Sequence, residues 1–227
     1  MEKKRVWEID FLRAFAVILM IIYHFAYDLY MLGLSDIDFH NGFWYWFQKL
    51  SWTFIFVSGI SSGFSKNPIK RGIKVFGFGV ALTIGSYIFI GNQFILFGVL
   101  HLLGFSLICS SFLRRLNKWL LLLISFFIIS LNFYVSGLST DSYWLVPLGI
   151  EKTGFRPFDN FPIIPHMGIF TLGLATYKFY YYKRMSIFGF SFENKFVSLI
   201  GRHSLLVYFI HQPIILGAMN IYILLFK

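Results

Sequence analysis

The stretch that decides the fold is EIDFLRAFAVILMIIYHFAYD, which runs from Glu8 to Asp28. It is predominantly apolar over about 20 positions, the length an α-helix needs to cross the hydrocarbon core of a bilayer. The same stretch nevertheless carries the ionisable residues Glu8, Asp10, Arg13, His24 and Asp28. Ionisable groups inside a membrane span are costly, so their presence indicates a functional site.

Helical geometry places several of these groups on one face of the predicted span. Arg13 and His24 are eleven residues apart, an offset of about 1100° that lies within roughly 20° of three full turns. Along the helix axis they are separated by about 16 Å. Asp28 follows His24 by four residues, a spacing that lets its carboxylate reach the imidazole. We therefore expect a cation near the start of this stripe and a His–Asp pair near its end.

The composition indicates an all-α, polytopic membrane protein. Of the 227 residues 57% are hydrophobic and only 13% are charged, about half the charged share of a soluble domain. The net charge of +10 is then attributed to basic loops beside the membrane rather than to nucleic-acid binding. The single cysteine, Cys109, excludes an intrachain disulfide and a multi-thiolate metal site. We expect one domain over residues 1–227, with no bound metal and no permanently bound cofactor.

Hydropathy predicts seven membrane-spanning helices, and the first of them is expected to be retained rather than cleaved as a signal peptide. The predicted spans are residues 9–33, 42–64, 71–90, 94–113, 117–136, 161–182 and 203–226.

The distribution of lysine and arginine predicts a cytoplasmic N-terminus, because basic residues concentrate in cytoplasmic loops. In this orientation fifteen basic residues lie inside and four outside, with Arg13 within the first span. The inner set is Lys3, Lys4, Arg5, Lys66, Lys70, Arg71, Lys74, Arg114, Arg115, Lys118, Lys178, Lys183, Arg184, Lys195 and Arg202, and the outer set is Lys49, Lys152, Arg156 and Lys227.

Two histidines near the outer side are candidates for proton transfer, because imidazole titrates close to neutral pH. His24 lies within the first span, and the alternative is a histidine packed between helices and bonded to a backbone carbonyl. His40 lies in the following loop, in DFHNGFW, and the alternative is a solvated loop histidine.

The later spans contain further polar groups. His101 lies inside the fourth span, and Asp159 is expected to cap the sixth span, which His166 then enters. GRHSLLVYFIHQP opens the seventh span and contains Arg202, His211 and Gln212. The basic entry of that span could bind phosphates or could simply anchor it at the membrane surface. Small residues in the second span, in FVSGISSGF, favour close helix packing or the approach of a ligand.

At these residues the sequence resembles the bacterial branch of the heparan-alpha-glucosaminide N-acetyltransferase-like family, within the wider transmembrane acyltransferase superfamily. The matching segments occur in the order of the family and cover most of the chain: EIDFLRAFAVILMIIYH, FIFVSGISSGF, FGVLHLLGFS, DNFPIIPHMGIFTLG and GRHSLLVYFIHQPI. Arg13 and His24 also match the Arg, ten residues, His spacing of the related acyltransferase-3 group. Two departures are Ala14, where the family commonly has glycine, and the lysosomal relatives' key histidine, whose place corresponds better to His40.

The resemblance implies transfer of an acyl group, expected to be acetyl, from cytoplasmic acyl-CoA as co-substrate to a hydroxyl or amine of an extracytoplasmic glycan or lipid-linked sugar. It implies His24 as the catalytic base, and we expect Asp28 to orient it, with His40 as the alternative base. Arg13, Arg71 and Arg202 are expected to bind acyl-CoA. The residues expected to contact substrate or support the site are Asp10, His101, Asp159, His166, His211 and Gln212.

The expected location is the cell membrane, as a multi-pass protein in contact with the lipid bilayer and with homodimerisation as a further expectation. The competing function is a proton-coupled transporter or channel, because intramembrane Arg, His and Asp residues are equally typical of ion pathways. Neither direct transfer nor a transient acyl-histidine is favoured by the residues alone.

Overall fold

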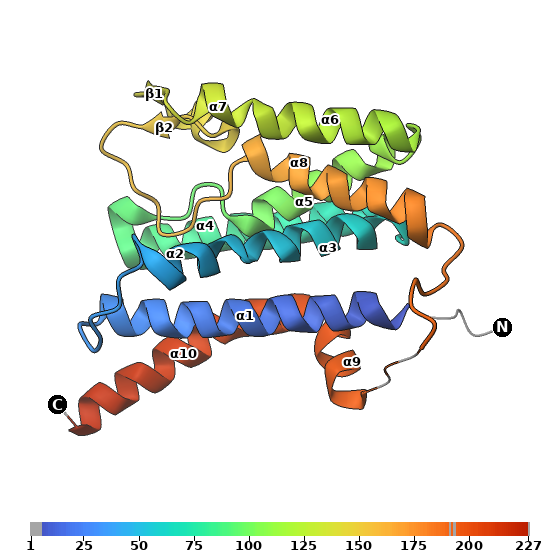
Figure 1. Cartoon of the computed structure of the whole chain (residues 1–227). Helices are drawn as coiled ribbons and strands as arrows, with labels where there is room; N and C mark the ends of the chain where they lie inside the picture. The colour runs from blue at the N-terminus through green and yellow to red at the C-terminus, as the bar shows by residue number, and fades with distance from the viewer. Residues whose placement is uncertain (1–5, 191, 193, 227) are drawn as a thin grey trace. The chain divides into compact units, whose positions relative to one another are not determined.

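The computed structural model describes residues 6–190, 192 and 194–226, and α-helices account for most of its regular structure (Figure 1). The predicted cytoplasmic residues Lys3, Lys4 and Arg5, and the predicted outer residue Lys227, lie outside the described residues. The chain divides into two compact units. We call Met1–Phe54 with Arg184–Lys227 the terminal unit, and Ile55–Lys183 the central unit. The expectation of one domain stays a prediction.

The terminal unit is built on the long helix α1 (Trp7–Met31), which packs against α9 (Lys195–Arg202) and α10 (Ser204–Phe226). The short helix α2 (Gly42–Lys49) also belongs to it. A Cβ on Gly201 would clash with the backbone carbonyl of Asp10, so only glycine allows the end of α9 to approach α1 this closely. The segment before α9 contacts the start of α1, where Ile187 N donates to Glu8 Oε1 at 2.9 Å.

The central unit contains α4 (Pro68–Ile90), α5 (Val99–Leu113), α6 (Lys118–Ser130), α7 (Asn132–Val135) and α8 (Ile163–Thr176), together with all but the first turn of α3 (Ser51–Gly63). Helix α4 packs on α5, and α6 packs on α8. Helices α3 and α8 approach each other at two glycines, because a Cβ on Gly59 would meet the carbonyl of Phe170 and one on Gly173 would meet the carbonyl of Phe56. The close packing predicted from the small residues of FVSGISSGF is therefore confirmed at Gly59.

Short elements complete the central unit. A 3-10 turn η1 (Gly91–Gln93) follows α4, and a second one, η2 (Tyr143–Leu148), lies in the segment after α7. The strands β1 (Ser139–Thr140) and β2 (Glu151–Lys152) pair in parallel, with Ser139 opposite Glu151. The π-helical turn η3 (Tyr177–Tyr181) extends α8.

Four helices among the described residues are long and apolar enough to cross a membrane: Trp7–Met31, Pro68–Gln93, Lys118–Val135 and Ser204–Leu225. Val99–Leu113 is apolar but shorter. The prediction of a helical membrane protein is confirmed at this level, whereas the seven crossings and the cytoplasmic N-terminus stay predictions. The second predicted span is divided between α2 and α3, which are separated at Leu50.

The fourth predicted span begins five residues later than expected, at Val99 rather than residue 94. Side chains satisfy the backbone N–H groups of the preceding segment. Ile95 N donates to Ser86 Oγ at 2.9 Å, Gly98 N to His101 Nδ1 at 3.2 Å, and Val99 N to Asp159 Oδ2 at 3.2 Å. With these side-chain acceptors available, the segment before Val99 does not need helical hydrogen bonds.

The prediction for Asp159 named the wrong helix, because its carboxylate contacts α5 rather than α8. It was expected to cap the sixth span, but α8 begins at Ile163 after Pro162, and the carboxylate of Asp159 instead accepts a hydrogen bond at the start of α5. Two backbone bonds hold the surrounding segment in place, from Phe158 N to Gln93 O and from Phe161 N to Phe97 O, each 2.9 Å long. The segment before α8 is thus attached to the loop before α5.

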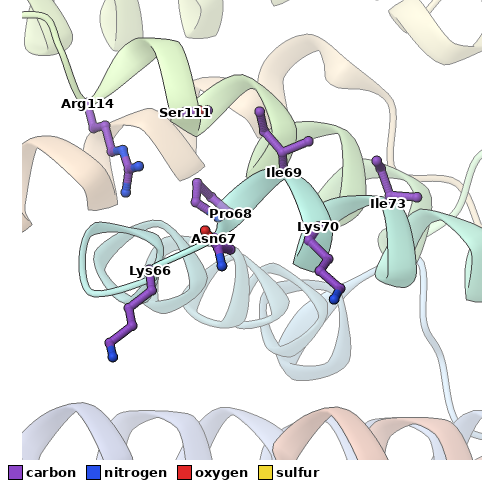
Figure 2. Close-up of a pocket in the computed structure, with 8 residues that line it drawn as sticks. All are labelled: Lys66, Asn67, Pro68, Ile69, Lys70, Ile73, Ser111 and Arg114. Carbon is purple, nitrogen blue, oxygen red and sulfur yellow. The ribbon is translucent and has the colours of Figure 1, made fainter.

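A pocket of about 400 Å³ opens where α3 ends and α4 begins (Figure 2). Its lining comes from the α3–α4 connection, the first turns of α4 and the end of α5. The lining residues are Lys66, Asn67, Pro68, Ile69, Lys70, Ile73, Ser111 and Arg114.

Asp159 is half-buried, and its desolvation is expected to make the stability of the central unit depend on pH. Burial raises the pKa of Asp159 to about 6, and the hydrogen bond from Val99 N opposes that rise only in part. A folded-state pKa above the unfolded value means that the folded protein binds the proton more tightly, so this group favours folding more as pH falls from 7 toward 4. Asp159→Asn removes the charge and keeps an oxygen acceptor for Val99 N. We expect the variant to melt a few degrees higher than the wild type at pH 7.5, given roughly 2–4 °C per kcal/mol for a chain of this size.

Thermal unfolding in detergent at pH 7.5 and pH 5 measures this effect, and the difference between variant and wild type should shrink at pH 5. Asp141→Asn is the control, because Asp141 is an exposed carboxylate in the same connection. A difference that stays constant between the two pH values would contradict the assignment of the titration to Asp159.

Candidate active site

The centre of the candidate site is a hydrogen-bonded pair between α1 and α10. Gln212 Nε2 donates to both carboxylate oxygens of Asp28, at 3.0 Å to Oδ1 and 2.8 Å to Oδ2. Asp28 is only 2% exposed. A buried carboxylate on an apolar helix needs a donor to offset its lost hydration, and the amide of Gln212 supplies it across 184 residues of sequence.

The prediction that Asp28 bonds to His24 is corrected by the structure, in which Asp28 accepts from Gln212 instead. The spacing of four residues between His24 and Asp28 places both side chains on one face of α1, but within the described part of the chain no hydrogen bond joins them. Both oxygens of Asp28 are taken by Gln212, and His24 Nδ1 is buried without a hydrogen-bond partner among the described residues. Helical spacing decides which residues share a face, and the neighbouring helix decides which of them bond.

The neighbour of His24 is His211 on α10. The two imidazole rings have their centroids 5.0 Å apart at an interplanar angle of 57°. His211 precedes Gln212 in the chain, so the same turn of α10 provides the partner of Asp28 and the partner of His24. The Asp28–Gln212 bond therefore fixes how the two histidines meet.

The tautomer of His211 follows from its backbone contact. Its Nδ1 lies 2.6 Å from the carbonyl oxygen of Tyr208, and because a carbonyl only accepts, Nδ1 must carry the proton. In the neutral ring Nε2 then holds the lone pair. Nε2 is buried and has no hydrogen-bond partner within the described residues. The pair thus contains two buried nitrogens, His24 Nδ1 and His211 Nε2, that have no hydrogen-bond partner among the described residues.

His40, the alternative base, lies apart from such an arrangement. Its side chain is 83% exposed, and Nδ1 is 3.8 Å from Asp38 Oδ1. Its backbone N–H donates to the same oxygen at 2.8 Å. That backbone bond is the main reason why the pKa of Asp38 is lowered, and the side chain of Asn41 adds to the effect. The geometry fits a solvated loop histidine in an Asx-type turn.

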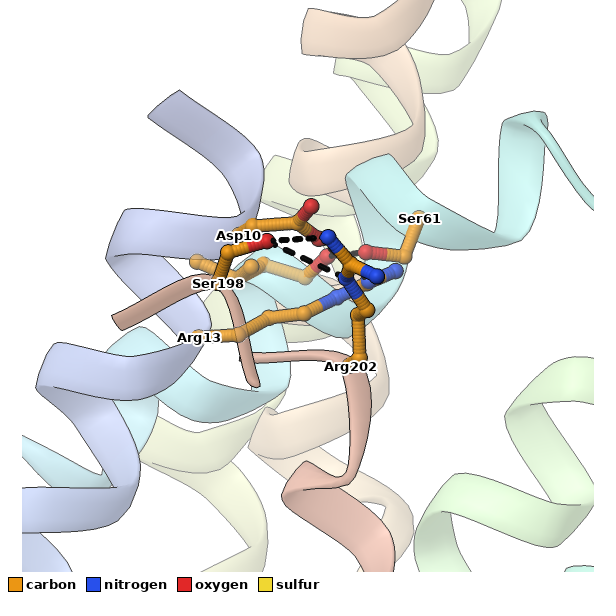
Figure 3. Close-up of polar contacts among 6 residues, drawn as sticks. Asp10, Arg13, Ser61, Ser198 and Arg202 are labelled. Carbon is orange, nitrogen blue, oxygen red and sulfur yellow. Dashed lines mark hydrogen bonds and ion pairs between the residues drawn. The ribbon is translucent and has the colours of Figure 1, made fainter. Parts of the chain in front are cut away.

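The two arginines expected to bind acyl-CoA in the terminal unit are both held by neighbours (Figure 3). Arg13 Nη1 is 3.3 Å from Asp10 Oδ1. Arg202 Nε and Nη2 both donate to Ser198 Oγ, at 3.1 and 2.9 Å. The contact of Gly201 with Asp10 brings the end of α9 to this part of α1. Two guanidinium groups and one carboxylate therefore gather near the start of α1, whereas Arg71 lies exposed on α4 in the central unit.

The imidazole of His101 holds two segments of the central unit together through hydrogen bonds at both ring nitrogens. Its Nδ1 accepts from Gly98 N, so the proton of the neutral ring is on Nε2, which lies 3.2 Å from Thr83 Oγ1. Thr83 Oγ1 in turn donates to Ile95 O at 2.7 Å. This chain of bonds engages both ring nitrogens and attaches α4 to the segment before α5.

His166 is held in a similar local way, with Nδ1 2.8 Å from the carbonyl oxygen of Pro162 at the start of α8. Together with Asp159, these histidines lie in the central unit and are not part of the His24–His211 pair. Among the residues that the structure describes, no group of three or more His, Cys, Asp and Glu side chains is arranged to hold a metal ion.

Sequence reasoning missed the pairing of His24 with His211 and of Asp28 with Gln212. The signal was present in the dipeptide His211–Gln212 within an apolar helix, because two adjacent polar residues at that depth each need a partner. What the sequence did not provide was the register between α1 and α10. The basic pocket at the start of α4 was also missed, although its lysines were assigned to the cytoplasmic side.

Comparison of the sequence with models of known protein families identifies the family to which the chain belongs. The family model described as "Heparan-alpha-glucosaminide N-acetyltransferase, catalytic" matches residues 5–213, a range that includes Arg13, His24, Asp28, His211 and Gln212. A search of curated proteins and a search of solved structures found no match. Because the match spans most of the 227 residues and the chain has four helices apolar enough to cross a membrane, the chain belongs to the family of heparan-alpha-glucosaminide N-acetyltransferase catalytic domains, a family of membrane acetyltransferases.

Proposed function

We propose that the protein transfers an acetyl group from cytoplasmic acetyl-CoA to a hydroxyl or amine of a sugar-containing acceptor on the outer side of the cell membrane. The observation that carries the proposal is the buried His24–His211 pair, which leaves one imidazole nitrogen of each ring without a hydrogen-bond partner among the described residues. Acyl transfer needs a base that is held in position and kept from bulk water. Family membership supports the reaction class.

His24 is the proposed general base. It takes the proton of the acceptor hydroxyl or amine while the oxygen or nitrogen attacks the carbonyl carbon of the thioester. The carbon–sulfur bond then breaks, and the CoA thiolate takes the proton back from the imidazolium. His211 lies beside His24 with its tautomer fixed by Tyr208 O, so its Nε2 offers a lone pair next to the ring that carries the proton. An acyl-histidine intermediate uses the same nitrogens, with the imidazole attacking the thioester first.

The proposed orientation has seven crossings and a cytoplasmic N-terminus, supported by fifteen basic residues on the inner side against four outside. CoA then approaches from the side on which Arg13, Arg71 and Arg202 lie, where guanidinium groups favour phosphate. Asp10 holds Arg13 at that end.

The orientation predicts which surface positions a membrane-impermeant thiol reagent reaches. In a Cys109→Ala background, we expect Ser139→Cys to be labelled in intact cells and Arg115→Cys to be labelled only after the membrane is opened. Both positions are exposed, so differences in labelling report the side of the membrane rather than burial. The opposite pattern would exchange the donor and acceptor sides of the proposed reaction.

The base assignment predicts the ranking of three histidine variants. We expect His24→Ala to lower the rate of transfer by about 10²–10⁴-fold, the usual contribution of a general base, with acetyl-CoA binding nearly unchanged. Release of CoA from labelled acetyl-CoA, with glucosamine as the acceptor, measures turnover. His211→Ala should lower it as well, because the ring beside His24 is lost.

His40→Ala is the matched control and should retain turnover, since its imidazole is exposed to solvent. If His40→Ala abolishes transfer and His24→Ala does not, the base lies in the outer loop and the buried pair is structural. A wild-type protein that moves protons across the membrane but releases no CoA would instead support the transporter alternative.

A further inference from the structure

Basic residues are prominent in the lining of the pocket at the start of α4 (Figure 2). Three of its lining residues are basic, namely Lys66, Lys70 and Arg114, and two more, Asn67 and Ser111, are neutral hydrogen-bonding groups. None of its lining residues is acidic. Like charges gathered without a counter-ion repel each other, so such a pocket favours a ligand that carries the opposite charge.

Arg114 is already oriented for such a ligand. Its Nη1 donates to the carbonyl oxygen of Ser65 at 3.0 Å, which fixes the side chain between the end of α5 and the α3–α4 connection. A guanidinium has five N–H donors, so this single bond leaves others for a ligand. The Arg114 side chain therefore loses less conformational entropy when a ligand binds than an unrestrained arginine side chain would.

The start of α4 adds a favourable dipole. Asn67 is the N-cap residue of this long helix, and its side chain makes no capping hydrogen bond. The N-terminal backbone N–H groups of a helix carry partial positive charge and attract anions. Here that end forms part of the pocket wall together with the lysines, so the dipole and the side-chain charges favour a ligand of the same sign.

We propose that this pocket binds the phosphate groups of a phosphate ester. Phosphate matches a set of one guanidinium and two ammonium groups. The volume of about 400 Å³ is within the range of small-molecule sites and exceeds what a single phosphate needs. The apolar side chains of Ile69 and Ile73 line the remainder, so the ligand has an organic part beside its phosphate.

Two sources supply this chemistry, the phosphates of acetyl-CoA and the headgroup of an anionic phospholipid. We assign acetyl-CoA, and this assignment rests on the proposed function, which brings CoA to the side where Lys66, Lys70 and Arg114 are placed. Arg71, which the sequence suggested for the same ligand, is not among the lining residues. The phosphate site itself does not depend on the transferase reaction.

The test uses the full-length protein with a double variant and a charge-matched control. Lys66→Gln with Lys70→Gln removes two positive charges from the pocket. Lys74→Gln with Arg115→Gln removes two from residues that lie close in the chain and do not line it. Calorimetry with CoA in neutral detergent, and retention of phosphatidylglycerol against phosphatidylcholine by native mass spectrometry, are the two readouts. The melting temperature of each variant shows that it is folded.

We expect the pocket variant to bind CoA about tenfold or more weakly, because charge-assisted bonds are lost, and the control to bind nearly as the wild type does. Loss of phosphatidylglycerol retention with unchanged CoA affinity would keep the phosphate site and overturn the assignment of CoA. Equal behaviour of the two variants in both readouts would overturn the site. A wild type that binds no CoA but retains phosphatidylglycerol through these lysines would refute the proposed function and leave the site standing.

Discussion

The candidate site depends on Asp28, a buried carboxylate that has no cationic partner in the part of the chain that the structure describes. Asp28 lies on an apolar helix at 2% exposure, and the amide of Gln212 meets both of its oxygens. Hydrogen bonds to a charged group contribute about 1.5–3 kcal/mol, and leaving the charge unpaired costs more. Any other rotation or translation of α10 against α1 would lose both bonds. The polar pair therefore specifies one register where apolar side chains alone would tolerate several.

That register has a chemical consequence one residue earlier in α10. Because His211 precedes Gln212, fixing the amide on Asp28 also brings the ring of His211 to within 5.0 Å of the ring of His24. The carbonyl of Tyr208 then selects the tautomer of His211. Two contacts that are structural in kind, one to a carboxylate and one to a carbonyl, thus produce the feature on which the proposed function rests, a pair of buried imidazole nitrogens without partners among the described residues.

Sequence reasoning succeeded where one helix contains the whole signal. The membrane class and the length of α1 both follow from the local sequence, since a run of about 20 apolar residues is enough to predict a membrane-length helix. It failed where two distant segments meet. The partner of Asp28 is 184 residues away, and Asp159 serves α5, which begins 60 residues earlier in the chain. Spacing told us that His24 and Asp28 share a face, but whether they bond depends on a competitor from α10 that no local pattern places.

The separation of Asp28 from His24 changes what the carboxylate contributes to the proposed reaction. A carboxylate bonded to the imidazole would hold its tautomer and its orientation, as in a catalytic triad. Asp28 instead accepts both hydrogen bonds from Gln212, and no hydrogen bond among the described residues joins it to His24. The proposed base therefore lacks the carboxylate partner that the helical spacing predicted, and Asp28 serves the packing of α10 on α1. Orientation, which the carboxylate supplies to the base in a triad, reaches this pair differently: the carbonyl of Tyr208 fixes His211, and the ring of His211 lies beside the ring of His24.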